Sequence, residues 1–191
     1  GLKIDFDVKS LSLHYYKEIT LPDSMSEDLA TFLGMLASDG GWSWPSIRIT
    51  EKKKGVEKLF RSLSKKLFNI DRVTSSTDKR NGVKTHSINS VPLCKYIEKL
   101  MGTSLANQKR VPEQILKGSE AEKKAFIKGL SLDGYYVEQK MSFVPYCGVS
   151  EELAKGLHQI CLQIFGYDTY YFERVCAVKL KKGLVLDYKT Y

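Results

Sequence analysis

Phe32-Leu33-Gly34-Met35-Leu36-Ala37-Ser38-Asp39-Gly40 is an apolar run that closes on an acidic residue and a glycine. Ser24 to Glu27 precedes it with the spacing Ser-x-x-Glu, a capping box that satisfies the free N–H groups of a first helical turn. Asp39-Gly40 is expected to end the helix, because glycine tolerates the left-handed conformation common at a C-terminal cap. The stretch therefore predicts a buried helix with a carboxylate at its end.

A second copy of this pattern lies in the other half of the chain. Ser119 to Glu122 repeats the capping box, and an apolar stretch again closes on Asp133-Gly134. In each half we expect a first pair of strands, an amphipathic helix and further strands. In the first half these are strands within 42–50, a helix at 56–68, and strands at 72–77 and 83–88. In the second half they are strands within 135–146, a helix at 150–164, and strands at 170–178 and 184–188. A helix over 92–101 has no counterpart in the second half.

This order predicts an α+β fold, with helices on one face of antiparallel sheets and a free, polar opposite face. We expect an N-terminal extension at 1–20, a first repeat at 21–110 and a second repeat at 111–191. Two similar halves with one such helix each can pack about a pseudo-twofold axis. Small residues allow the close approach that this needs, and the candidates at the helix interface are Gly34, Ser38 and Gly129. Asp39 and Asp133 would then lie side by side.

Charge and composition favour a polyanionic partner. The chain of 191 residues has 30 Lys and Arg against 22 Asp and Glu, a formal net charge of +8. Such an excess suits phosphate backbones, because neutralising them releases counterions. The four cysteines have no metal-site spacing, which indicates buried thiols in a reducing, intracellular setting whose compartment stays open. No apolar run reaches the ~18–20 residues that span a bilayer.

These residues resemble the LAGLIDADG homing endonucleases in their two-motif, single-chain form. Phe32 to Gly40 matches the family motif closely and Phe126 to Gly134 less closely, while Lys109-Arg110-Val111-Pro112 resembles the Lys-x-Ile/Val-Pro segment of intein-encoded members. The resemblance implies two αββαββα units, the second here without its last helix, whose saddle-shaped sheets cover DNA. It also implies that Asp39 and Asp133 ligate Mg²⁺ or Mn²⁺, and that Lys109 is an active-site lysine that polarises water or neutralises the scissile phosphate.

The expected activity is metal-dependent hydrolysis of both strands of a long, near-asymmetric DNA site by a monomer. Side chains on the polar sheet face are the candidates for DNA contacts, and they are Ser46, Arg48, Thr50, Arg72, Thr74, Ser76, Lys84, His86, Glu138, Lys140 and Arg174. Lys79 and Arg80 lie in a predicted turn that suits phosphate contacts. Trp42 and Trp44 flank the carboxylate end, where they can cap the core or lie against DNA.

Two departures from the family pattern leave alternatives open. Gly34 precedes Asp39 by five residues, whereas Gly129 precedes Asp133 by four. One missing residue turns an α-helix by ~100°, which puts the activity of the second carboxylate in question. The chain also has no terminal residues of a splicing reaction, so we expect an endonuclease without a splicing module. A catalytically decayed DNA-binding protein and an RNA maturase are the alternatives.

Overall fold

The computed structural model describes residues 1–7, 19–51, 55–132, 136–137, 142–143, 149–166, 174–179 and 185–190. The elements of the first half are α1 (Glu27–Ser38), β1 (Gly40–Ser43), β2 (Ser46–Glu51), α2 (Val56–Phe68), β3 (Thr74–Thr77), β4 (Lys84–Asn89) and α3 (Val91–Met101). The second half has η2 (Ala106–Gln108), α4 (Glu113–Leu116), α5 (Glu120–Leu130), β5 (Tyr136–Val137), β6 (Ser142–Phe143), α6 (Glu151–Phe165), β7 (Arg174–Lys179) and β8 (Val185–Thr190). The order αββαββα thus recurs from α5 to β8 without a final helix in the described residues, and the predicted α+β class is confirmed.

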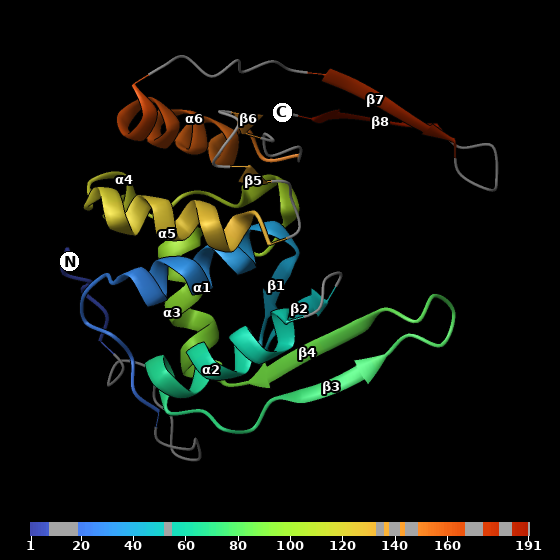
Figure 1. Cartoon of the computed structure of the whole chain (residues 1–191). Coiled ribbons are helices and arrows are strands. Elements are labelled where there is room, and N and C mark those ends of the chain that lie inside the picture. Colours follow the sequence, from blue (N-terminus) through green and yellow to red (C-terminus); the bar gives the residue numbers. More distant parts are fainter. Residues whose placement is uncertain are drawn as a thin grey trace.

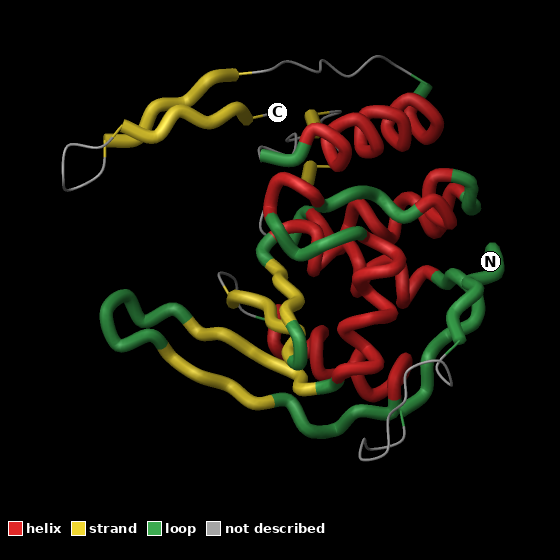
Figure 2. Tube along the Cα trace, turned by 180° about the vertical axis from the view of Figure 1, so that it is seen from behind, coloured by secondary structure: helices red, strands yellow, loops and turns green. Residues whose placement is uncertain are grey.

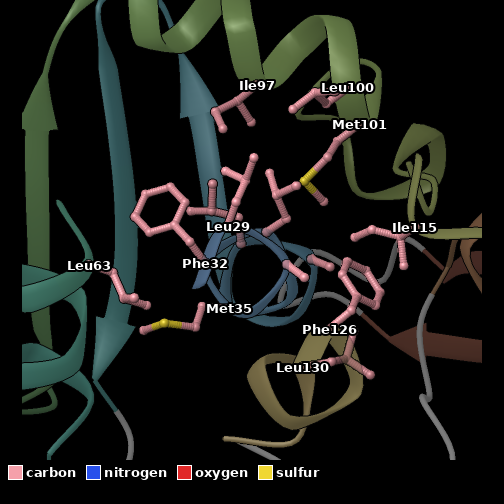
Figure 3. Close-up of a cluster of buried hydrophobic side chains, with 14 of the residues drawn as sticks. Leu29, Phe32, Met35, Leu63, Ile97, Leu100, Met101, Ile115, Phe126 and Leu130 are labelled. Carbon is pink, nitrogen blue, oxygen red and sulfur yellow. The ribbon is translucent and has the colours of Figure 1, made fainter. Parts of the chain in front are cut away.

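Helix α1 forms the centre of the hydrophobic core. Its side chains from Leu29 to Ala37 are buried apart from the half-buried Thr31 at one edge. Figure 3 shows Leu29, Phe32 and Met35 of α1 in a cluster whose other labelled side chains come from α2, α3, α4 and α5. The surrounding side chains in this view are Leu63, Ile97, Leu100, Met101, Ile115, Phe126 and Leu130. A helix that is apolar on every side is stable only when other elements enclose it, which explains why two halves pack around this one.

The helix starts differ in detail from the predicted capping boxes. Ser119 and Glu122 form the expected reciprocal box at the start of α5. In α1, however, the N-cap is Ser26 and not Ser24, because the Ser26 hydroxyl accepts the hydrogen bond from the Leu29 N–H at 3.2 Å. The helix accordingly begins at Glu27.

The first half contains one antiparallel sheet with strand order β1-β2-β4-β3. Its register pairs Trp42 with Ile47, and Ile47 with Ile88, on the face that meets the helices. All three of these side chains are buried. Directly opposed residues share a face of a sheet, so the residues between them must point away from the core.

Helices α1 and α5 cross at a pair of glycines, as predicted for an interface at which two helix backbones approach closely. A Cβ atom on Gly34 would lie 2.2 Å from the Phe126 carbonyl oxygen, and a Cβ atom on Gly129 would lie 2.1 Å from that of Thr31. The neighbours are also reciprocal: Gly34 faces the backbone of Phe126 and Leu130, while Gly129 faces that of Thr31 and Met35. Position 34 therefore corresponds to position 129 in the two halves. Ser38 is half-buried near the end of α1.

The strands beyond the first sheet form two separate pairs among the described residues, β5 with β6 and β7 with β8. The β3–β4 and β7–β8 hairpins extend on the same side of the helical layer, on the right in Figure 1 and on the left in the reverse view of Figure 2.

At the N-terminus, Ile4 is buried and its N–H donates to the Asp23 carbonyl at 2.6 Å. No helix in the described ranges is long and apolar enough to cross a membrane.

Candidate active site and nucleic-acid interface

Asp39 stands at the junction of helix α1 and strand β1. It is the C-cap of α1, with φ −102° and ψ 10°, and its Oδ2 oxygen is buried. Gly40 does not take the left-handed conformation that the sequence predicted. Glycine is required there for space instead, because a Cβ atom would lie 2.4 Å from the Leu36 Cα. The chain thus enters the sheet directly after the carboxylate.

Lys109 reaches this junction from the linker between the two halves. Its side chain is buried, and its Nζ donates to the carbonyl oxygens of Gly40 at 2.8 Å and Leu36 at 3.0 Å. Burial lowers the pKa of Lys109 to about 8, while the neighbouring Asp39 charge acts in the opposite direction. The ammonium also lies 5.6 Å from the centre of the Trp42 ring, which is close enough for a cation–π contact. Lys109 therefore lies beside the candidate carboxylate, bonded to the backbone.

Asp133, the second predicted ligand, lies outside the described residues. The end of α5 nevertheless bears on it, because the C-cap of this helix is Ser131, two positions before Asp133 in the sequence. In α1 the cap is Asp39 itself. Counted from the crossing glycines, position 39 corresponds to position 134, so the second carboxylate precedes its symmetric position by one residue.

The carboxylate of Asp39 fits a hard divalent cation as one of its ligands. Mg²⁺ prefers oxygen and is commonly held by one or two carboxylates, with water and phosphate filling its other positions. Within the described ranges no group of three or more His, Cys, Asp or Glu side chains gathers around a common point. A site here would thus need Asp39, a partner carboxylate and oxygen atoms from the substrate.

The outer face of the first sheet is made of hydroxyl and amide side chains around one arginine. The middle row across the strands is Gly41, Arg48, Ser87 and Thr74. The flanking rows are Ser43, Ser46 and Asn89 on one side, and Thr50, Thr85 and Ser76 on the other. The Arg48 side chain is exposed and crosses Gly41, whose missing side chain leaves room for it. Such groups can hydrogen-bond to base edges in a major groove.

His86 is a correction to the predicted contact residues. It is completely buried on the inner face, where its Nδ1 lies 2.8 Å from the Ser75 Oγ and 3.8 Å from a Glu57 oxygen. Arg61 joins this network through hydrogen bonds to Glu57 at 2.8 Å and to the Val73 carbonyl at 2.9 Å. The histidine therefore connects helix α2 to strands β3 and β4 on the inner face of the sheet.

Thr85 and Ser87 occupy the outer positions of β4 that the sequence interpretation missed. The signal was Ile88, because the apolar residue marks the core face and places its alternate neighbours outside. Lys84 lies two residues from His86 and so is on the same, inner face of β4. Its side chain is exposed because the β3–β4 hairpin projects beyond the helices. Ser43 and Asn89 were missed as well.

Of the other predicted contact residues, some are exposed, and two lie outside the described residues. Arg72 is exposed just before β3, and Lys79 and Arg80 are exposed at the tip of the β3–β4 hairpin, where Arg80 pairs with Asp78 at 2.9 Å. Trp42 is buried in the core, whereas Trp44 is 67% exposed at the β1–β2 turn. Arg174 begins strand β7, and Glu138 and Lys140 lie outside the described residues.

Comparison with known proteins supports the fold. Three solved structures of the homing endonuclease I-DmoI are similar to this chain, and each similarity covers 86% of it. The structure of mesophilic variants has a TM-score of 0.52 and 18% sequence identity, with 88% of that chain covered, and the complex with DNA and Ca has a TM-score of 0.52 and 18% identity, with 83% covered. The complex with DNA and Mn has a TM-score of 0.50 and 17% identity, with 89% of that chain covered. The chain therefore shares the fold of these endonucleases. No protein-family model matches it.

A curated relative is matched by sequence over a small part of its own length. The chain is 31% identical over 151 residues, or 78% of its length, to an A-type ATP synthase subunit of Pyrococcus abyssi (strain GE5 / Orsay). The matched part makes up 14% of that protein.

Proposed function

We propose that this chain is a LAGLIDADG-type, site-specific endonuclease that hydrolyses both strands of duplex DNA with Mg²⁺ or Mn²⁺. The observation that carries the proposal is the crossing of α1 and α5 at Gly34 and Gly129, with Asp39 at the end of α1 where the sheet begins. The shared fold with I-DmoI, solved in complex with DNA and Mn, supports it. The net charge of +8 supports a polyanionic substrate.

In this proposal the sheets bind the duplex and the helix ends carry the reaction. Residues 21–110 and 111–191 are the two repeats, each contacting one half of a near-asymmetric site, and one chain suffices. Arg48 reads a guanine edge while the neighbouring hydroxyls contact bases more permissively. Lys79 and Arg80 contact backbone phosphates and set the register of the protein on the duplex.

Asp39 and Asp133 are the proposed metal ligands. A divalent cation bound there supplies an activated water and stabilises charge on the departing oxygen. Asp39 would offer one hard oxygen ligand from the end of α1, directly before β1. The intein-like context is part of the proposal, since the curated match covers only 14% of a much longer polypeptide and the Lys109-Arg110-Val111-Pro112 segment has the intein pattern.

A catalytically decayed DNA-binding protein is the second candidate. The sequence position of Asp133 favours it, because α5 ends at Leu130, three residues before that carboxylate, whereas α1 ends one residue before Asp39. A protein of this kind would bind a specific duplex without cutting it.

Incubation with a plasmid library of candidate sites in Mg²⁺ and in Mn²⁺ separates these functions. We expect the parent to linearise a subset of plasmids, and we expect Asp39→Asn and Asp133→Asn each to yield much less linear product. Asp71→Asn is the matched control, because Asp71 is an exposed carboxylate that pairs with the exposed Lys65 of α2, away from the helix crossing. Specific binding without cutting in either metal would support the decayed protein, and preferential RNA binding would support a maturase.

A further inference from the structure

Lys109 supplies a positive charge and hydrogen-bond donors to the carbonyl groups at the C-terminus of helix α1. The last turn of α1 has no basic residue, and its cap is the acidic Asp39. The final carbonyl groups of a helix have no partner within it, and an acidic residue at this negative end of the helix dipole adds to the imbalance. A cation at this position therefore stabilises both the carbonyl groups and the carboxylate.

The contacts of the Lys109 ammonium leave no hydrogen free for a substrate. Four carbonyl oxygens lie within reach of Nζ: Gly40 at 2.8 Å, Leu36 at 3.0 Å, Ala37 at 3.3 Å and Ser38 at 3.5 Å. An ammonium group has three donors, so these acceptors use all of them. The residue is 6% exposed and lies over the Trp42 ring, whose Nε1 is itself anchored to the Gly102 carbonyl at 3.1 Å.

The backbone of the same residue holds the second half. The Lys109 carbonyl accepts a hydrogen bond from the buried Ser150 hydroxyl at 2.5 Å. Ser150 is also the N-cap of α6, where its oxygen accepts from the Leu153 N–H at 3.2 Å. One residue thus joins the end of α1 in the first half to the start of α6 in the second.

We infer that Lys109 is a positioning residue, which acts through Asp39 by fixing the end of α1 and does not contact the DNA. The inference rests on the proposed endonuclease function for its consequence, but the structural part stands by itself. It replaces the role expected from the family resemblance, in which this lysine meets water or phosphate. A lysine enclosed by backbone carbonyls would have to break these bonds to reach a substrate.

The test compares Lys109→Met with Lys95→Met. Methionine keeps the apolar stem and removes the donors, and Lys95 is an exposed lysine on α3 whose loss provides the matched control. In the DNA-free protein we expect the amides at residues 38–41 to exchange hydrogen at least about tenfold faster in Lys109→Met and unchanged in Lys95→Met. Cleavage should slow about 10–100-fold at saturating DNA, as for other residues that orient a metal ligand, with the KM for DNA unchanged.

Salt dependence of DNA binding in Ca²⁺ distinguishes positioning from phosphate contact. A lost phosphate contact lowers the slope of log K against log salt by about 0.9. We expect the Lys109→Met slope to equal that of the parent. A lower slope, together with unchanged exchange at residues 38–41, would overturn the inference.

Amine labelling of the parent keeps the test valid if Lys109→Met does not fold. Reductive methylation should modify Lys95 and leave Lys109 protected in the absence of DNA. Labelling of Lys109 at the rate of Lys95 would refute the enclosed position. If the parent neither binds nor cuts DNA, the proposed function fails, while labelling and hydrogen exchange still decide whether Lys109 holds α1.

Discussion

Arg48 carries a positive charge in the middle of the hydroxyl-rich outer face of the first sheet. If this face enters a major groove, its guanidinium reads one guanine, a contact worth about 1–3 kcal/mol of discrimination against the wrong base. Arg48→Ala should therefore relax the preference at one base pair. Fluorescence anisotropy on a series of singly substituted duplexes measures this change.

Arg80 provides the contrast to Arg48, because it lies at the exposed tip of the β3–β4 hairpin. We expect Arg80→Ala to weaken binding to all duplexes in the series alike and to lower the salt slope by about 0.9. A uniform loss for Arg48→Ala as well would show that Arg48 contacts only the backbone.

The buried thiols of Cys94 and Cys161 give a prediction on pH. Burial raises the pKa of each to about 11, from an ordinary value of 9.0. Between these values the native chain keeps protons that the unfolded chain has lost, so their contribution to stability is present below pH 9 and declines as the pH rises toward 11. Urea unfolding of the parent should lose more stability from pH 8.5 to 10.5 than that of the Cys94→Ala, Cys161→Ala variant. An identical loss in both proteins would contradict the assignment.

Single residues were predictable where the strand pattern was clear. The alternation of Ile47 and Ile49 correctly placed Ser46, Arg48 and Thr50 on the opposite face. His86 was placed on the outer face because it is polar, although it lies two residues from Ile88 and so shares the core face of β4. Its partner Glu57 comes from another element, and no local pattern reveals such a contact.

At the scale of elements, the crossing of α1 and α5 depends on the absence of two side chains. Gly34→Ala and Gly129→Ala should each destabilise the fold by about 2–3 kcal/mol, because the new Cβ atoms meet rigid backbone at 2.2 Å and 2.1 Å. Gly41→Ala is the control, since its Cβ would make only an ordinary contact at 3.6 Å with the Arg48 side chain. Chemical denaturation measures the three free energies of unfolding, and equal values would contradict the close approach.

Most helices were predictable because their apolar periodicity and caps agree. The expected spans 56–68 and 92–101 lie within a residue of α2 and α3. The short helices η2 and α4 were not predicted, because segments of three and four residues are too short to show helical periodicity.

At the scale of the whole molecule, the duplication in the sequence predicted two halves around paired helices. It did not predict what joins them. The bonds from Lys109 to the end of α1 and to Ser150 depend on a linker that returns to the helix ends, and long-range contacts of this kind leave no periodic signal. The family resemblance identified Lys109 as important but not the contacts that enclose it.

The two halves differ in the position of the carboxylate, and this difference predicts unequal rates of cleavage for the two DNA strands. The halves correspond at Gly34 and Gly129, yet the carboxylates follow these glycines at five and four residues. Metal chemistry depends on ligand position, since an ångström of misplacement can cost about 100-fold in rate. We therefore expect supercoiled plasmid to accumulate as a nicked circle before it becomes linear, with one strand cut first. Strand-specific end labels follow this directly, and Asp133→Asn should slow the conversion of nicked to linear DNA more than the first nick. Simultaneous cutting of both strands would mean that the chain after Ser131 compensates for the missing residue and restores an equivalent carboxylate.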